Sequence, residues 1–473
     1  MAYLETLAWL RPEFLAALHV LAAALVTGHV LLHKRDVRAA IAWIGLSWLS
    51  PFAGSLLYTM FGINRVRRRA VRAGWRPALS RWDAAPLPAV QSEEFAPLER
   101  AVGSITKRPP LAGNAIRSLR NGDEAYPLML EAISQATKSV ALSSYIFFAD
   151  DAGDKFIDAL VAAKSRGVEV RVIIDGVGSG YFWSTTYSRL RRHQVPVARF
   201  MHSHLPWQMP FLNLRNHKKI LLIDGRKGFV GGLNISASNL LDSHPPQPVR
   251  DMHFYVEGPV LGQITEAFAS DWLFAMGEEL RGEIWFPDLA EAGPALTRII
   301  TSGPDQDIDK IQFVFLQAIG SAERSIKIIT PYFLPDDRLI AALSLAAMRG
   351  VDVDVVVPEA SDHLVMDWAL RANIGPLLQA GCRIWRAPRP FEHSKMLTVD
   401  GGWSLIGSAN WDLRSLRLNF EITMEVYDRA FATLVFQQIE AKQGKPITLK
   451  ELNARSLPVR LRDSAVRLML PYL

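Results

Sequence analysis

Two short stretches of the chain contain the same arrangement of residues that can handle a phosphate group. The first, HKKILLIDGRKGFVGGLN, covers residues 217–234, and the second, HSKMLTVDGGWSLIGSAN, covers residues 393–410. Both fit the pattern H-x-K-x4-D-x6-G-x2-N, in which five residue types recur at the same offsets. A buried strand with charged ends would explain one such stretch, but it would not explain a second copy with identical spacing. The repeat therefore indicates one site built from two copies.

The chemistry of this site follows from what its side chains can donate and accept. On a strand, residues two apart point to the same face, so each histidine shares a face with its lysine. Ammonium and amide groups donate hydrogen bonds, and an imidazole can serve as nucleophile or acid. If the copies converge, cations and amides can hold phosphodiester oxygens while one imidazole attacks phosphorus and the other protonates the departing alcohol. The residues predicted to act in this way are His217, Lys219, Asn234, His393, Lys395 and Asn410.

No metal or other cofactor is expected, because the lysines can neutralise the phosphate charge. The stretch MHSH at residues 201–204 offers His202 and His204 as an alternative zinc pair, but no carboxylates accompany them. Cys382 is the only cysteine, which excludes an intramolecular disulfide and a cysteine-based metal cluster. The net charge of +6 suits an anionic membrane surface and nucleic acid equally well.

The elements that must position the two motifs also occur twice. Residues 136–175 and 321–360 both read as a strand, an acidic turn, a helix, the tripeptide RGV and a second strand, with Tyr145 matching Tyr332. Alternating strands and helices predict parallel βαβ units, and a glycine at a helix end is a usual stop signal. Self-similarity within one chain indicates duplication. We therefore predict two related halves, residues 119–295 and 296–473.

The N-terminal region differs from the rest. Residues 14–32 and 39–64 contain no Asp, Glu, Lys or Arg, and each run reaches the ~20 residues needed to cross a bilayer. We predict that residues 1–64 form a hairpin of two transmembrane helices, at about 14–32 and 39–62, followed by a basic, proline-rich linker at 65–118. Five arginines between positions 65 and 72 place the downstream body on the cytoplasmic side by the positive-inside rule. A signal peptide and a pair of buried core helices are the alternatives.

Two further segments have a composition that suits a membrane interface. Residues 202–215 form a proline-containing stretch with Trp207, Met209, Phe211 and Leu212, directly before the first motif. Residues 459–473 alternate arginines with apolar residues. Either segment can lie on an anionic surface or pack on the folded body.

At this point the chain resembles the phospholipase D superfamily, whose signature is the duplicated HxKxxxxD motif, and within it the bacterial cardiolipin synthases. The resemblance covers nearly the whole chain and rests also on YTMFGINRVRRR, SSYIFFADD, TPYFLPDD and GSANWDLRSLRLNFE. Many superfamily members have G-S-x-N in the first motif, and the GGLN of this chain is similar to cardiolipin synthases. The resemblance implies an α/β fold of two pseudo-symmetric halves, with mixed β-sheets flanked by helices.

The resemblance also implies roles for individual residues. One motif histidine forms a phosphohistidine, with His217 favoured as nucleophile and His393 as acid. Asp224 and Asp400 belong to the catalytic motifs and are expected to fix the turn after each strand. Further along, Glu421 and Asp251 are expected to accept the distal N–H of a catalytic imidazole.

The implied reaction is phosphatidyl transfer between two phosphatidylglycerol molecules, giving cardiolipin and glycerol. A phospholipase D-type hydrolase, a superfamily nuclease and a noncatalytic membrane scaffold are the alternatives; two intact motifs argue against the scaffold, and a membrane hairpin argues against the nuclease. The expected partners are phospholipids and the membrane, without nucleic acid and with the oligomeric state open. The expected location is the bacterial cytoplasmic (inner) membrane, as a multi-pass protein.

Overall fold

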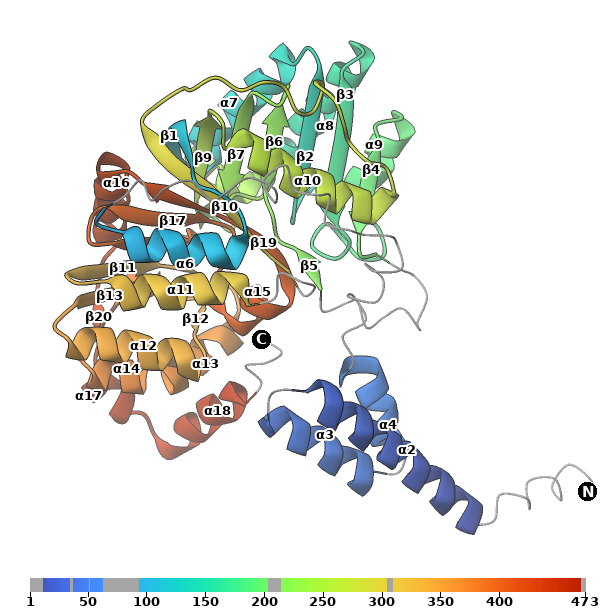
Figure 1. The fold of residues 1–473 in the computed structure, drawn as a ribbon, viewed down its shortest axis with the longest axis vertical. Coiled ribbons are helices and arrows are strands. Elements are labelled where there is room, and N and C mark those ends of the chain that lie inside the picture. The colour runs from blue at the N-terminus through green and yellow to red at the C-terminus, as the bar shows by residue number, and fades with distance from the viewer. Residues whose placement is uncertain are drawn as a thin grey trace, which may run out of the picture. The chain divides into compact units, whose positions relative to one another are not determined.

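The computed structural model describes residues 12–34, 37–50, 52–62, 93–202, 214–303 and 309–468. These residues belong to two compact units, a group of helices within residues 12–62 and an α/β body from residue 93 onward (Figure 1). The arginines at 65–72, the linker up to residue 92, the stretch 203–213 and the last five residues lie outside the described residues.

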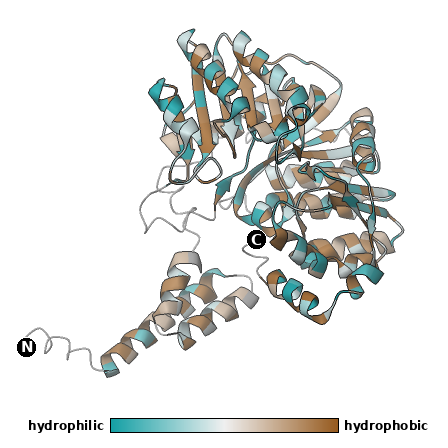
Figure 2. Cartoon of the chain, turned by 180° about the vertical axis from the view of Figure 1, so that it is seen from behind, coloured by the Kyte–Doolittle hydropathy of each residue, from teal (hydrophilic) through white to brown (hydrophobic). Residues whose placement is uncertain are grey.

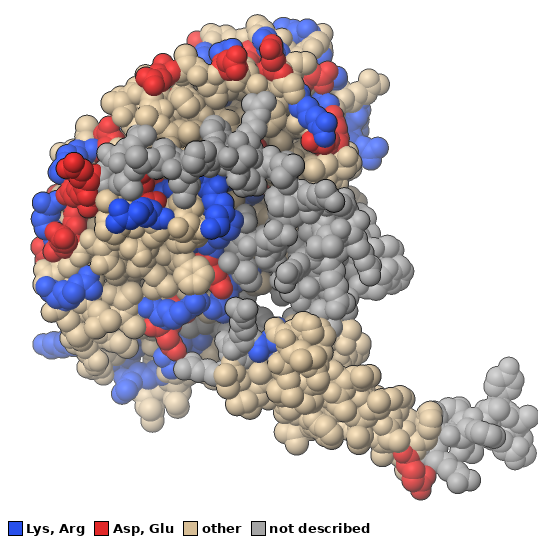
Figure 3. Space-filling view, in the orientation of Figure 1, with Lys and Arg blue, Asp and Glu red and all other residues tan. Residues whose placement is uncertain are grey.

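The helical unit begins with α2 (Pro12–His33), a helix of 22 residues that is about 33 Å long. Glu13 is its only acidic residue, and its surface carries hardly any charged atoms (Figure 3). Large apolar side chains such as Leu25 and Leu32 are exposed on it. Within the described residues, α2 alone is long and apolar enough to cross a membrane.

The second predicted membrane helix, at about 39–62, is interrupted in the described residues rather than continuous. The run divides into α3 (Val37–Leu49), α4 (Ala53–Leu57) and the π-helical turn η2 (Tyr58–Gly62). The 13 residues of α3 extend about 20 Å, which is short of the ~30 Å hydrocarbon core. Phe52 has a φ of 58°, a left-handed conformation that an α-helix does not accommodate. Nevertheless α3 packs beside α2, and Trp48 Nε1 donates to Thr27 Oγ1 at 3.0 Å.

In the described residues, the α/β body is built on one 16-stranded mixed sheet. The strand order in the first half is β4-β3-β2-β6-β7-β9-β1, and in the second half it is β14-β13-β11-β16-β17-β19-β10, with β20 added at the outer edge. In each half the first three strands of these orders run parallel and the third pairs antiparallel with the fourth. The halves join where β1 pairs antiparallel with β10. The two halves therefore have one topology, which confirms the predicted α/β fold.

The first half contains β1 (Leu111–Arg120), α7 (Asn121–Gln135), β2 (Ser139–Ser144), α8 (Asp151–Ser165), β3 (Glu169–Asp175), α9 (Thr185–Arg192), β4 (Val197–Phe200), β5 (Arg215–Asn216), β6 (Ile220–Ile223), β7 (Lys227–Gly231), η4 (Ala237–Asn239), η5 (Leu241–Ser243), β8 (Val249–Arg250), β9 (Met252–Glu257) and α10 (Leu261–Met276). The second half contains β10 (Ala295–Ser302), α11 (Lys310–Ser321), β11 (Ser325–Ile329), β12 (Phe333–Leu334), α12 (Asp337–Met348), β13 (Asp352–Pro358), α13 (Leu364–Asn373), α14 (Gly375–Gln379), β14 (Arg383–Ala387), β15 (Phe391–Glu392), β16 (Met396–Val399), β17 (Trp403–Gly407), β18 (Trp411–Asp412), α15 (Leu413–Arg417), β19 (Asn419–Tyr427), α16 (Arg429–Glu440), β20 (Pro446–Ile447), α17 (Leu449–Asn453) and α18 (Leu457–Arg467).

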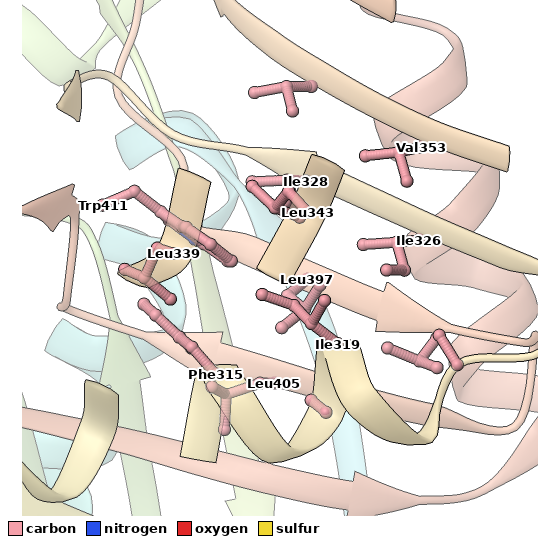
Figure 4. Packing of buried hydrophobic residues seen from close by; sticks show 14 of the residues in the cluster. Phe315, Ile319, Ile326, Ile328, Leu339, Leu343, Val353, Leu397, Leu405 and Trp411 are labelled. Carbon is pink, nitrogen blue, oxygen red and sulfur yellow. The ribbon is translucent and has the colours of Figure 1, made fainter. Parts of the chain in front are cut away.

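Each half has its own apolar core between sheet and helices. In the second half, Phe315 of α11 and Leu343 of α12 pack over Ile328 of β11 and Leu397 of β16 (Figure 4). The sheet strands are predominantly hydrophobic, whereas the helices show mixed faces (Figure 2). Strands buried on both faces require this composition, and helices that cover a sheet need only one apolar side.

The range predicted as linker contains folded elements. Helix α6 (Ala96–Thr106) buries Leu98 and Val102 in the core of the second half, and β1 is the central strand that joins the halves. The prediction of a linker up to residue 118 is therefore wrong over its described part. The proline-rich composition suggested a linker, but Pro109 and Pro110 lie only in the connection between α6 and β1.

Candidate active site

Two buried inner strands position the motifs. His217 and Lys219 directly precede β6, and His393 and Lys395 precede β16, which is the equivalent strand of the second half. The backbone before each histidine pairs with the opposite half, β5 with β19 and β8 with β15. His217 N donates to Phe420 O at 2.9 Å, and His393 N donates to the Arg250 carbonyl at 2.7 Å. Each catalytic candidate is therefore attached to the other half of the body.

The His217 imidazole has one ring nitrogen fixed by two acceptors. Its Nδ1 lies 3.0 Å from Glu421 Oε2 and 3.1 Å from the Ser408 carbonyl oxygen. Because both partners accept hydrogen bonds, Nδ1 must carry the proton in the neutral ring. The lone pair then resides on Nε2. This tautomer is the one that a nucleophilic histidine requires.

The His393 imidazole has different surroundings. Its Nδ1 lies 2.6 Å from Asp251 Oδ2 and 2.9 Å from Lys395 Nζ. Asp251 comes from the first half and Glu421 from the second, so each histidine is oriented by a carboxylate of the opposite half. The two carboxylates occupy equivalent positions in their halves. Asp251 lies two residues before His253, which pairs with Gly231 of the first motif. Glu421 lies two residues before Thr423, which pairs with Gly407 of the second motif.

The ionisable groups of the two motifs form one electrostatic cluster. Lys219 is 2% exposed, and its Nζ donates to the His217 carbonyl at 2.7 Å. Burial lowers the pKa of Lys219 to about 7, against the opposing charge of Glu421, and lowers the pKa of Lys395 to about 8. Burial and the charges of Lys219 and Lys395 hold the pKa of His217 well below its usual value. The lysines of both halves therefore act on one reaction centre.

The two orienting carboxylates differ in charge preference. Burial raises the pKa of Glu421 to about 7, although Lys219 and the hydroxyl of Ser408 oppose the shift. Burial also acts on Asp251, but the neighbouring Lys395 and His393 outweigh it and lower the pKa of that carboxyl. Asp251 is thus ionised near neutral pH and favours a protonated His393, although burial and the charge of Lys395 lower the pKa of that imidazole overall. Glu421 is only partly ionised near neutral pH, so it stabilises a protonated His217 less strongly than Asp251 stabilises a protonated His393.

The two motif asparagines lie at the same point of their halves. Asn234 Oδ1 accepts from Ile146 N at 3.2 Å, which leaves its amide N–H groups to donate. Asn410 is buried. Burial raises the pKa of the neighbouring Asp412 carboxyl to about 6, and a hydrogen bond from the Asn410 side chain opposes this shift.

Asp224 and Asp400 do not lie with the other motif residues. They follow the far ends of β6 and β16, with φ angles of 53° and 52°. Asp224 accepts from the backbone N–H groups of Thr137, Lys138 and Ser139, and Asp400 accepts equivalently from residues 323–325. Their geometry fits the expected fixing of a turn and offers no contact with a reacting phosphate.

Replacement of Asp224 by Ala should therefore affect stability more than chemistry. Loss of an acceptor shared by three N–H groups should cost about 1–3 kcal/mol of unfolding free energy. The expected result is a lower Tm with nearly unchanged turnover by the remaining folded enzyme. Asp158→Ala, at a side chain that is 78% exposed, is the matched control. An inactive Asp224→Ala variant with unchanged Tm would contradict this structural role.

The sequence-based site omitted two tyrosines that contact the histidines. The Tyr145 ring lies 4.9 Å from His217, edge to face, and Lys219 Nζ lies 5.2 Å from the centre of the same ring. Tyr332, its counterpart, lies 6.5 Å from His393. Their matched positions in the repeated segments were a signal that could have identified them.

The zinc alternative at residues 201–204 gains no geometric support. His202 Nε2 lies 2.8 Å from the Tyr181 carbonyl oxygen, and His204 lies outside the described residues. Across the described residues no group of three or more His, Cys, Asp and Glu side chains is arranged as a metal site.

The lowered lysine pKa values predict a descending alkaline limb in the pH profile. Lys219 and Lys395 are charged below about 7 and 8 and lose their charge as the pH rises through these values. Because the charged forms bind phosphate, kcat/KM for an anionic phosphodiester should fall by up to about tenfold per pH unit between pH 7 and 8, and more steeply above pH 8, where both lysines lose their charge. The decline in kcat should be smaller, since bound phosphate favours the charged lysines. A flat kcat/KM between pH 6 and 9.5 would contradict the assignment of the lysines to phosphate binding.

Comparisons with known proteins agree with this geometry. The profile of a family described as cardiolipin synthase, PLD-like domain, matches residues 129–272 and 315–442, and each matched segment contains one motif. Cardiolipin synthase 1 of Bacillus anthracis is 32% identical over 469 residues, covering 94% of this chain and 91% of that protein. Cardiolipin synthase A of Pseudomonas putida (strain GB-1) is 34% identical over 463 residues, covering 94% and 95%.

Among solved structures, phosphatidylserine synthase from Haemophilus influenzae Rd KW20 has a TM-score of 0.62. It is 17% identical and covers 80% of this chain and 100% of that chain, so the likeness concerns the fold. The family profile and the near full-length relatives confirm the resemblance carried by the motifs. The chain therefore belongs to the cardiolipin synthase family of proteins with a PLD-like domain.

Proposed function

We propose that the protein is a membrane-bound phosphatidyltransferase that makes cardiolipin from two phosphatidylglycerol molecules. The observation that carries this proposal is the pair of histidines in one lysine-rich cluster, each oriented by a carboxylate of the opposite half. A phosphodiester exchange in two displacements needs a nucleophile and an acid that later acts as base. Two separately oriented imidazoles meet that requirement.

In the first step, His217 Nε2 attacks the phosphorus of one phosphatidylglycerol. The P–N bond forms and the bond from phosphorus to the glycerol oxygen breaks. Protonated His393 delivers its proton to that oxygen, and free glycerol leaves. The two-acceptor arrangement at His217 Nδ1 and the ionised Asp251 beside His393 support this division of roles.

In the second step, a terminal hydroxyl of another phosphatidylglycerol attacks the phosphatidyl-histidine. Neutral His393 takes the hydroxyl proton, the new P–O bond forms, and the P–N bond to His217 breaks. Lys219, Lys395, Asn234 and Asn410 would hold the nonbridging phosphate oxygens throughout, which favours the charge that develops on them. Both histidines end in their starting protonation states.

The same first step would serve a hydrolase if water replaced the second lipid. Membership of the cardiolipin synthase family supports the transferase. Relatives named cardiolipin synthase also support phospholipid substrates and association with a membrane, and the apolar helix α2 suits such an anchor. We place the protein in the bacterial cytoplasmic membrane, with more than one membrane pass and the body on the cytoplasmic side.

Product analysis tests this function. Purified full-length protein in vesicles of phosphatidylglycerol should form cardiolipin and glycerol in equal amounts. Addition of phosphatidylethanolamine tests whether a second lipid can enter the reaction. Formation of phosphatidic acid and glycerol without cardiolipin would show a hydrolase and overturn the proposal.

A further inference from the structure

Large apolar side chains are exposed beside the tyrosine of each half. The loop after β3 presents Phe182, which is 64% exposed, and Trp183, which is 89% exposed. In the second half, the chain after β13 presents Leu364, at 65% exposed, and Val365, at 38%. The two pairs follow equivalent parallel strands, which places them at the carboxyl edge of the sheet in both halves.

Both apolar pairs are connected to the reaction centre through short contacts. Ser179 Oγ donates to the carbonyl of Tyr145, whose ring contacts His217. In the second half, Tyr332 Oη donates to Asp362 Oδ1 at 2.7 Å, two residues before Leu364. Each exposed pair therefore lies within three residues of a side chain that is hydrogen-bonded to the tyrosine beside one motif histidine.

The aromatic loop is an ordered structure despite its exposed tip. Arg199 Nη2 donates to the Gly180 carbonyl at 2.5 Å and to the Tyr181 carbonyl at 2.6 Å. Asp175 Oδ1 accepts from the backbone N–H groups of Val177 and Gly178. This anchored loop keeps the Phe182 and Trp183 side chains exposed to water. Their exposure is unfavourable in free energy unless the side chains insert into an apolar phase.

A cationic amphipathic helix extends the apolar surface of the second half. Val466 of α18 packs against the cluster that contains Tyr332 and Met366. On the outer side of α18, Leu457, Leu461 and Leu468 are 62–77% exposed and lie on one helical face by their spacing. Exposed Arg460 and Arg467 lie beside this face. A stripe of leucines flanked by arginines matches an anionic bilayer surface.

We propose that the Phe182–Trp183 pair, the Leu364–Val365 pair and the leucine face of α18 form a docking rim that inserts into an anionic bilayer. This inference rests on the proposed function, because a two-chain lipid must present its phosphate to the site while its chains stay in the membrane. Tryptophan suits the interfacial layer, and the arginines face the lipid headgroups. The rim brings the active site to the surface where its substrate lies.

Lipid quenching tests the rim directly. Cys382 is buried, so Trp183→Cys can be labelled selectively with an environment-sensitive dye in the full-length protein in phosphatidylglycerol vesicles. Lipids that carry a nitroxide should quench this dye strongly. The matched control is Met348→Cys at the end of α12, which is 69% exposed and lies at the opposite edge of the sheet. Equal quenching at the two positions, or none at position 183, would overturn the proposal.

The dye could also be shielded from water by a second copy of the chain. In that case the shielding would be lost when the protein is diluted into excess lipid, and this result would also overturn the docking rim. A parallel arm compares Phe182→Ser/Trp183→Ser with Leu345→Ser/Met348→Ser. The first double variant should lose about tenfold activity on vesicles and little in detergent micelles, since only vesicles require docking. Equal vesicle activities of the two double variants would contradict the rim. Failure of the wild type to form cardiolipin would instead overturn the proposed function, whatever the quenching result.

Discussion

Replacement of His217 or His393 by Ala is expected to lower kcat for cardiolipin formation by at least about 10⁴-fold. His217 supplies the atom that bonds to phosphorus, and His393 supplies the proton without which glycerol is a poor leaving group. Because both act in one step, the double variant should be hardly less active than either single variant. The measurement is the initial rate with labelled phosphatidylglycerol.

His244→Ala is the control, since this histidine is exposed and its Nδ1 lies 3.0 Å from the Asp242 carbonyl oxygen. It should retain wild-type activity, and all three variants should keep the wild-type Tm within a few degrees. Full activity in either motif variant would contradict a mechanism with two histidines.

Asp251→Asn is expected to lower kcat with phosphatidylglycerol by about 10²–10⁴-fold, with a loss that depends on the leaving group. Asp251 Oδ2 lies 2.6 Å from His393 Nδ1, so the neutral amide removes the charge that stabilises the imidazolium. A phosphatidyl ester of p-nitrophenol needs no protonation of its leaving group. Asp251→Asn and His393→Ala should therefore recover much of the rate of p-nitrophenol release in the first turnover, before His393 is needed as the base of the second step.

Glu421→Gln supplies the contrast. Glu421 orients the nucleophile, because its Oε2 lies 3.0 Å from His217 Nδ1. Its loss, like that of His217, should reduce the rates with phosphatidylglycerol and with the p-nitrophenyl ester alike. If the activated ester restored His217→Ala and left His393→Ala inactive, the roles of the two histidines would be reversed.

The two motifs could be predicted because their spacing is local. His217 and Lys219 lie two residues apart directly before β6, as His393 and Lys395 do before β16, and a second copy with the same spacing implies a shared site. The partner of each imidazole could not be predicted in this way. Asp251 meets His393 across the two halves through β8 and β15, which are two residues each and carry no recognisable periodicity. Such short pairings arise only once the halves are folded together.

The N-terminal region shows a similar limit. Apolar composition predicted α2 to within two residues at each end, but it did not place the break in the second run, where Phe52 has a φ of 58°. Pro51, the residue before it in the sequence, is the local signal for such a break. The basic, proline-rich composition of residues 65–118 resembled a linker, whereas β1 within this range pairs with both β9 and β10.

Capture of the covalent intermediate tests the central claim most directly. Full-length enzyme would be mixed with labelled phosphatidylglycerol, quenched at alkaline pH, which preserves phosphohistidine, and digested for peptide mapping. The expected result is a phosphatidyl group, or its deacylated remnant, on the peptide that contains His217, with glycerol released in an amount equal to the labelled enzyme plus the cardiolipin formed. The label should be absent from the peptide that contains His393 and from His217→Ala. Label on His393, or continued cardiolipin synthesis without any labelled histidine, would contradict the mechanism.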